Sequence, residues 1–176
     1  MSKWIARLIL PLIIWITLFV ESYAEIKISY HKHYDLQLAF GNNFTWEINN
    51  DNNGKNILLS VCIEGDNLLR RYEMAIEAKE KALISVTLFH DNSALYYGVS
   101  KKDSKGECSV FEKLLVSSNT LLPTKIFEGK ISPKEGDKVD LFHLLSLDDK
   151  SKNLKVYFEL KKLNSDFERD KIQIVE

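Results

Sequence analysis

The stretch FTWEINNDNNGKNILLSVCI, residues 44–63, carries the strongest signal for the fold class. Apolar Phe44, Trp46 and Ile48 alternate with polar residues, which is the pattern of a strand with one buried face. The pair Asn53-Gly54 follows, and Asn-Gly favours a hairpin turn because both residues tolerate positive φ. A continuous apolar run then resumes. The stretch therefore predicts two strands that are joined by a tight hairpin.

The same two-residue period recurs in both directions from this stretch. The segments that show it, or that read as buried apolar strands, are 26–30, 36–40, 83–89, 94–99, 109–116, 124–131, 138–142 and 154–160. Clusters of Asn, Asp, Ser, Gly and Lys separate them, as turns require. Many short strands at a spacing of roughly ten residues predict an all-β, antiparallel β-sandwich, with a β-barrel as the alternative.

One segment, residues 67–81, fits two structures. It is rich in residues that favour helices, and Asp66 or Asn67 could cap a helix start. However, Tyr72, Met74 and Ile76 alternate with charged or small residues, which fits a strand. We expect a strand, because the neighbouring segments are strands. A helix here would make the fold α+β.

The N-terminal residues 1–24 have the layout of a secretory signal peptide. Lys3 and Arg7 precede an uncharged apolar run over 8–20, and Ser22-Tyr23-Ala24 places small residues at a cleavage site. The run is shorter than the roughly 20 residues of a membrane-spanning helix, although an uncleaved signal anchor is the alternative. We expect cleavage after Ala24 and a secreted or periplasmic protein with no stable membrane span. Residues 25–163 would form one β-sandwich domain, and 164–176 a charged C-terminal tail.

Export also bears on the two cysteines, Cys62 and Cys108. An oxidising compartment and an even number of cysteines favour a Cys62–Cys108 disulfide. The alternative is two buried free thiols. Neither cysteine lies in a local pattern that would lower its pKa and make it a catalytic thiolate.

Charge and motifs narrow the function classes. The formal net charge is −1, so the chain lacks the excess of basic residues that nucleic-acid binding requires. The motifs of the common hydrolases, redox centres and phosphate-binding loops are absent from the sequence. We therefore expect a non-catalytic module that binds a protein or a component of the cell envelope. A metal-binding export protein and a small hydrolase with a non-standard site are the alternatives.

The metal-binding alternative rests on His31 and His33. Residues two apart on a strand point to the same side, so both imidazoles could bind Zn²⁺ or Cu²⁺. A third ligand would have to come from His90, His143 or Asp35. The competing interpretation is an exposed pair near a strand end. No other cofactor is indicated.

Two further patterns concern the surface. Asn43-Phe44-Thr45 is a glycosylation acceptor if the host is eukaryotic. Tyr96 and Tyr97 are adjacent on an expected strand, so one should face the core and the other the solvent. An exposed tyrosine is a candidate anchor for a protein partner.

Overall fold

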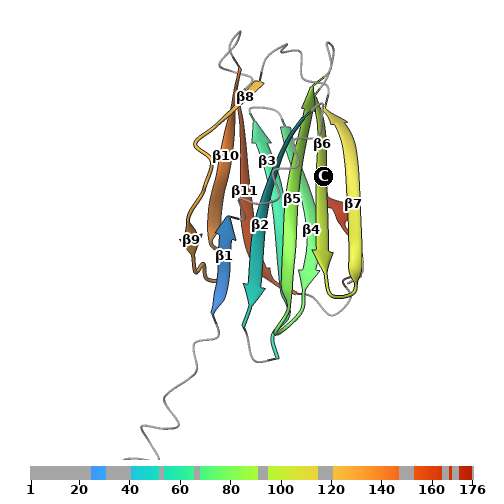
Figure 1. Cartoon of the computed structure of the whole chain (residues 1–176), viewed down its shortest axis with the longest axis vertical. Helices are drawn as coiled ribbons and strands as arrows, with labels where there is room; N and C mark the ends of the chain where they lie inside the picture. The colour runs from blue at the N-terminus through green and yellow to red at the C-terminus, as the bar shows by residue number, and fades with distance from the viewer. Residues whose placement is uncertain are drawn as a thin grey trace, which may run out of the picture.

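The computed structural model describes residues 25–30, 41–51, 54–65, 68–90, 95–114, 121–146, 153–163, 167 and 171–175. Figure 1 shows two layers of strands that face each other and do not close into a barrel. No helix occurs among the described residues. The predicted all-β sandwich is confirmed.

Each sheet holds six antiparallel strands. The first sheet has the order β7-β6-β5-β2-β1-β9 and the second has the order β12-β4-β3-β11-β10-β8. The strands of the first sheet are β1 Ile26–Tyr30, β2 Gly41–Asn50, β5 Lys81–His90, β6 Leu95–Asp103, β7 Gly106–Leu114 and β9 Lys130–Ile131. Those of the second are β3 Ile57–Gly65, β4 Leu68–Ile76, β8 Leu121–Thr124, β10 Lys138–Ser146, β11 Leu154–Lys162 and β12 Gln173–Val175.

Trp46 lies at the centre of the core between the sheets. It is fully buried, and its indole Nε1–H donates to the Phe127 carbonyl at 3.0 Å. Its ring is stacked on Phe142 from the second sheet, with centroids 6.2 Å apart, and meets Phe158 edge-on at 5.7 Å. The alternation around Trp46 thus correctly predicted the inward face of β2.

Residues 68–76 form strand β4 rather than a helix. Tyr72, Met74 and Ile76 are fully buried, while Glu73 between them is only half-buried. The period of two therefore prevails over the helix propensity of the individual residues, because the buried face stabilises the strand.

The predicted hairpin around Asn53-Gly54 is wrong. β2 pairs with β1 and β5, whereas β3 pairs with β4 and β11, so the turn carries the chain from one sheet to the other. Gly54 does adopt a positive φ of 81°. The buried Asn50 fixes this crossing, because its amide Nδ2 donates to the carbonyls of Lys55 and Glu77, each at 3.0 Å.

Two other expected segments differ in the structure. The segment 124–131 is not one strand: β8 ends at Thr124, Lys125 has a φ of 52°, and the chain crosses to β9 in the other sheet. Part of the expected tail 164–176 is also ordered within the sandwich. Gln173–Val175 forms β12 on the edge of β4, next to the buried Ile172.

Candidate functional site

The predicted metal ligands His31 and His33 lie outside the described residues, as does the predicted signal peptide. His143 lies half-buried on the outer face of β10, with its Nε2 4.0 Å from Asp140 Oδ2. Among the residues that are described, no three His, Cys, Asp or Glu side chains come close enough to hold a metal ion. The His31–His33 site stays a prediction.

Asn43 lies near the start of β2 and is half-buried. Its side-chain carbonyl accepts a hydrogen bond from Thr87 Oγ1 on the neighbouring strand β5, at 3.2 Å. The side chain thus already has a partner within its sheet. Its use as a glycosylation acceptor stays a prediction that depends on the host.

The predicted Cys62–Cys108 disulfide is wrong: both thiols are free. Cys62 is in β3 and alternates with the core residues Val61 and Ile63, so it faces the outer side of the second sheet. Cys108 is in β7 of the first sheet and packs against the core. The second sheet therefore stands between the two side chains. Burial raises the pKa of both thiols, so neither is prepared to act as a nucleophile.

The four sheet edges differ greatly in length. Three are formed by short strands: β9 has two residues, β12 has three and β8 has four. The fourth edge is β7, with nine residues, and it has no neighbour on its outer side among the described strands. Short edge strands protect a sheet against unwanted pairing, whereas a long one offers a row of backbone donors and acceptors. β7 is thus the edge best suited to receive another strand.

The side chains of β7 alternate cleanly. Cys108, Val110 and Glu112 point inward and are half-buried. The outward set is exposed and includes a cation, an anion and a large aromatic ring: Glu107, Ser109, Phe111 and Lys113. We call these four residues and their neighbour Tyr96 the β7 surface.

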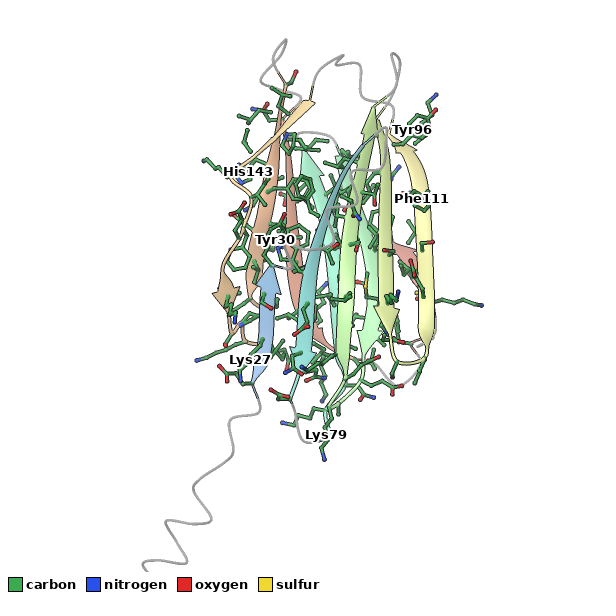
Figure 2. The ribbon with its side chains drawn as sticks, in the orientation of Figure 1. Lys27, Tyr30, Lys79, Tyr96, Phe111 and His143 are labelled. Carbon is green, nitrogen blue, oxygen red and sulfur yellow. The ribbon has the colours of Figure 1, made fainter. Side chains whose placement is uncertain are left out.

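Phe111 is the most exposed large hydrophobic residue of the described chain, at 66%. Its ring lies across Gly98 of β6, where an added Cβ would come within 2.3 Å of Phe111 Cε1. The Phe111 ring can therefore lie here only because residue 98 is a glycine. The Lys113 ammonium lies 5.7 Å from the ring centroid of Tyr96 beside it. Figure 2 shows Phe111 and Tyr96 on the same side of the molecule, far from His143.

Contacts to the second sheet hold β7 in place from within. The Tyr72 hydroxyl of β4 donates a short hydrogen bond to the Glu112 carboxylate. The Tyr72 ring also packs against the fully buried Tyr97 of β6, with centroids 5.3 Å apart. Burial is the main cause that raises the pKa of Tyr72, so this hydroxyl stays a donor. The edge strand is therefore well anchored.

A buried charge cluster lies in the same region, where β6 turns into β7. Lys101 points inward from β6 and is 6% exposed. Its ammonium lies 2.6 Å from Asp103 Oδ2 and 3.7 Å from Glu80 Oε1. Asp103 also accepts from the backbone N–H groups of Lys105 and Gly106, at 2.8 and 3.2 Å. The cluster thus fixes the hairpin that leads into β7.

The two carboxyl groups of this cluster have opposite pKa shifts. Burial, together with the nearby Asp103 carboxylate, raises the pKa of Glu80 above its usual range. Burial would also raise the pKa of Asp103, but the hydrogen bond from Lys101 and the neighbouring Glu80 carboxyl outweigh it. With the Lys105 amide, they lower the pKa of Asp103 to about 2.

These shifts predict opposite effects of pH on the free energy of unfolding. Asp103 titrates at about 2 in the folded protein and ordinarily at 3.8, so its contribution is complete above 3.8 and lost towards pH 2. Glu80 has a raised pKa, so its contribution is present below 4.5 and lost as pH rises. Asp103→Asn should flatten the acid limb of the stability curve, and Glu80→Gln should flatten the limb above pH 4.5. Urea unfolding across pH, followed by tryptophan fluorescence, tests both; identical curves for the two variants would contradict the assignment.

A shallow groove on the outer face of the second sheet is the other candidate. It has a volume of about 440 Å³ and is lined in part by Leu69, Arg71, Lys138 and Tyr157. Its cations already have partners: Arg71 Nη2 lies 3.6 Å from Glu159, and Lys138 Nζ donates to the Tyr157 hydroxyl at 3.3 Å. Arg71 thus has a carboxylate partner, whereas Lys138 contacts a neutral hydroxyl.

The burial of some of these residues could be predicted from the sequence, and that of others could not. Tyr97 is buried, as was predicted for one of the two adjacent tyrosines, whereas Tyr96 is half-buried rather than exposed. The run 101–105 resembles a solvated loop tip, yet Lys101 is buried. The signal for this was the alternation of Tyr97, Val99 and Lys101 on one face of β6. Nothing in the sequence identifies β7 as a sheet edge, because that depends on strand order.

Within the described part of the chain, no helix is both long and apolar enough to span a bilayer. Comparisons of the chain with protein-family models, with curated proteins and with solved structures find no match. The case for a function therefore rests on the β7 surface and on the strand order that exposes it.

Proposed function

We propose that this protein is an exported, non-catalytic β-sandwich module that binds a polypeptide partner by strand addition to β7. In strand addition, an extended segment pairs with an exposed sheet edge, and side-chain contacts add specificity. The observation that carries the proposal is the contrast between the nine-residue edge of β7 and the other three edges, which have two to four residues.

The backbone of β7 supports this function. In an antiparallel pair, alternate residues of a strand direct their N–H and C=O groups to the neighbour, and the others direct theirs away. About half of the β7 amides therefore face the open edge. The internal hydrogen bond from Tyr72 to Glu112 and the Lys101–Asp103 ion pair hold the strand extended. A partner would not have to order this edge before pairing with it, which favours affinity.

The side chains of the β7 surface supply an anchor. Aromatic residues, including phenylalanine, are enriched in the buried cores of protein interfaces. Phe111 presents its ring at the edge, and Lys113 and Glu107 flank it with opposite charges. A partner segment would cover Phe111 with an apolar side chain and match the two charges.

Native mass spectrometry of the protein from its own source is the first test. A chain that begins at Glu25 would support export, and a chain that keeps Met1 or Ser2 would contradict it. Additional polypeptide mass that is lost on denaturation would reveal the partner. Hydrogen exchange on this complex should then show protection of the amides of residues 106–114. Protection confined to another strand would contradict strand addition at β7.

Phe111→Arg is expected to weaken partner binding by about 30-fold, the equivalent of about 2 kcal/mol for a central aromatic anchor. Leu122→Arg is the matched control, because Leu122 is 46% exposed and lies on the short β8 edge of the other sheet. It should leave affinity unchanged. Titration calorimetry measures both, with thermal unfolding to verify that each variant folds. Equal losses in the two variants would argue against β7 as the binding edge.

A further inference from the structure

We infer that the polypeptide bound at β7 is a second copy of this chain, paired antiparallel about a two-fold axis at Val110. The inference rests on the proposed function, and it names the partner of that same edge. A two-fold interface uses one surface twice, so its residues must be complementary to one another. The sequence of β7, GECSVFEKL over residues 106–114, meets this requirement in one register.

The exposed charges of β7 select that register. When two β7 strands pair antiparallel around Val110, Glu107 of each copy lies opposite Lys113 of the other. Both residues are exposed on the outward face of β7. The two-fold axis generates the pair twice, and opposite charges at directly facing positions stabilise an antiparallel pair.

The apolar residues fit the same arrangement. Phe111 would lie opposite Ser109, so the two Phe111 rings would be diagonal neighbours across the axis, within reach of aromatic side chains. Phe111 is 66% exposed in the single chain. Each ring would then be covered by the other copy. On the inward face, Val110 would meet its own counterpart.

Shifting the centre of the pair by one residue in either direction removes the Glu107–Lys113 match. Centring the pair on Ser109 places Glu107 opposite Phe111. Centring it on Phe111 places Ser109 opposite Lys113 and leaves Glu107 facing a position beyond the end of β7 at Leu114. Only the Val110 register joins the cation to the anion. The other three edges, at two to four residues, are too short to offer a comparable pairing.

Charge reversal tests the inference. Glu107→Lys and Lys113→Glu each place like charges opposite each other twice, so each should weaken dimerisation by at least about tenfold. The double variant E107K/K113E restores the opposite pairs and should recover dimerisation. Glu135→Lys makes the same charge change at an exposed site in another part of the chain and should have no effect. Sedimentation velocity from about 1 μM to about 1 mM covers the relevant affinities.

The outcomes separate this inference from the proposed function. A wild-type chain that stays monomeric over this range would overturn the second copy as partner. The proposed function would survive that result if another polypeptide co-purifies and protects residues 106–114. A dimer that ignores both single reversals, or that the double variant fails to restore, would overturn the Val110 register.

Oxidative cross-linking gives a second test, because a disulfide traps the dimer even when its association is weak. In a Cys108→Ser background, the double variant E107C/K113C should form a disulfide-linked dimer on oxidation. The two positions are six residues apart on one strand, or roughly 20 Å at about 3.4 Å per residue, so they cannot join within a chain. Neither single cysteine variant has a facing partner in this register, and neither should cross-link. Equal cross-linking of the single and double variants would overturn the register.

Discussion

Replacing Trp46 with alanine is expected to lower the free energy of unfolding by about 3–5 kcal/mol, the usual cost of removing a large aromatic side chain from a core. Trp46 is fully buried and contacts aromatic rings from both sheets. Its loss would leave a cavity between the layers and an unsatisfied carbonyl at Phe127. Urea unfolding followed by circular dichroism measures the change, because the variant lacks the tryptophan that reports on the core.

Trp46→Phe separates packing from hydrogen bonding. Phenylalanine fills much of the same space but cannot donate to the Phe127 carbonyl, which holds the chain between β8 and β9 against the core. We expect this variant to lose about 1–3 kcal/mol, the cost of leaving a buried acceptor unpaired. A loss below about 1 kcal/mol for Trp46→Ala would be incompatible with the central position of this ring.

Replacing Lys101 with methionine is expected to cost about 3–5 kcal/mol at neutral pH, because it leaves buried carboxyl groups without their cation. The Lys101 ammonium lies 2.6 Å from Asp103, and the side chains of both residues are almost completely buried. Protonation relieves the uncompensated charge, so the penalty should shrink as pH falls towards 2. Chemical unfolding at several pH values measures both effects.

Two controls make the result for Lys101 specific. The triple variant K101M/D103N/E80Q removes all three charges together and should recover most of the lost stability. Replacing every charged residue of a buried ionic cluster by a neutral one destabilises the fold far less than removing a single partner. Lys102→Met changes the next residue, which is exposed, and should stay within about 0.5 kcal/mol of the wild type. A penalty for Lys101→Met that is independent of pH would show that packing, and not charge, accounts for the loss.

The inward face of strands with clear apolar alternation was predictable, but strand pairing was not. Side-chain alternation located the inward Trp46 and predicted a strand at residues 68–76, because a period of two is visible in the local sequence. It indicated that either Tyr96 or Tyr97 faces the core, but not which one. The Asn53-Gly54 signal specified a turn but not its destination. Whether a turn joins neighbours in one sheet or crosses to the other depends on contacts with residues far along the chain, such as Asn50 with the carbonyl of Glu77.

The features of the candidate site likewise depend on strand arrangement, which local sequence patterns did not predict. The disulfide prediction failed because it relied on compartment and count, and neither indicates that Cys62 faces away from Cys108 across a sheet. In the sequence, Phe111 looks like any other aromatic residue of a strand. Its exposure depends on the edge position of β7, and the position of its ring depends on the absence of a side chain at Gly98. These features depend on three-dimensional neighbours that local sequence patterns do not encode.

The position of β3 has a consequence for how the chain folds during synthesis. Ile57–Ile63 is buried on both faces, and β3 lies between β4 and β11. β4 follows at once along the chain, but β11 is not complete until residue 162 has been made. For most of translation, one edge of the most apolar strand therefore has no native partner, and such segments are prone to aggregate. We expect folding to be slow, limited by the arrival of β11, and to depend on chaperones that cover Ile57–Ile63 until then.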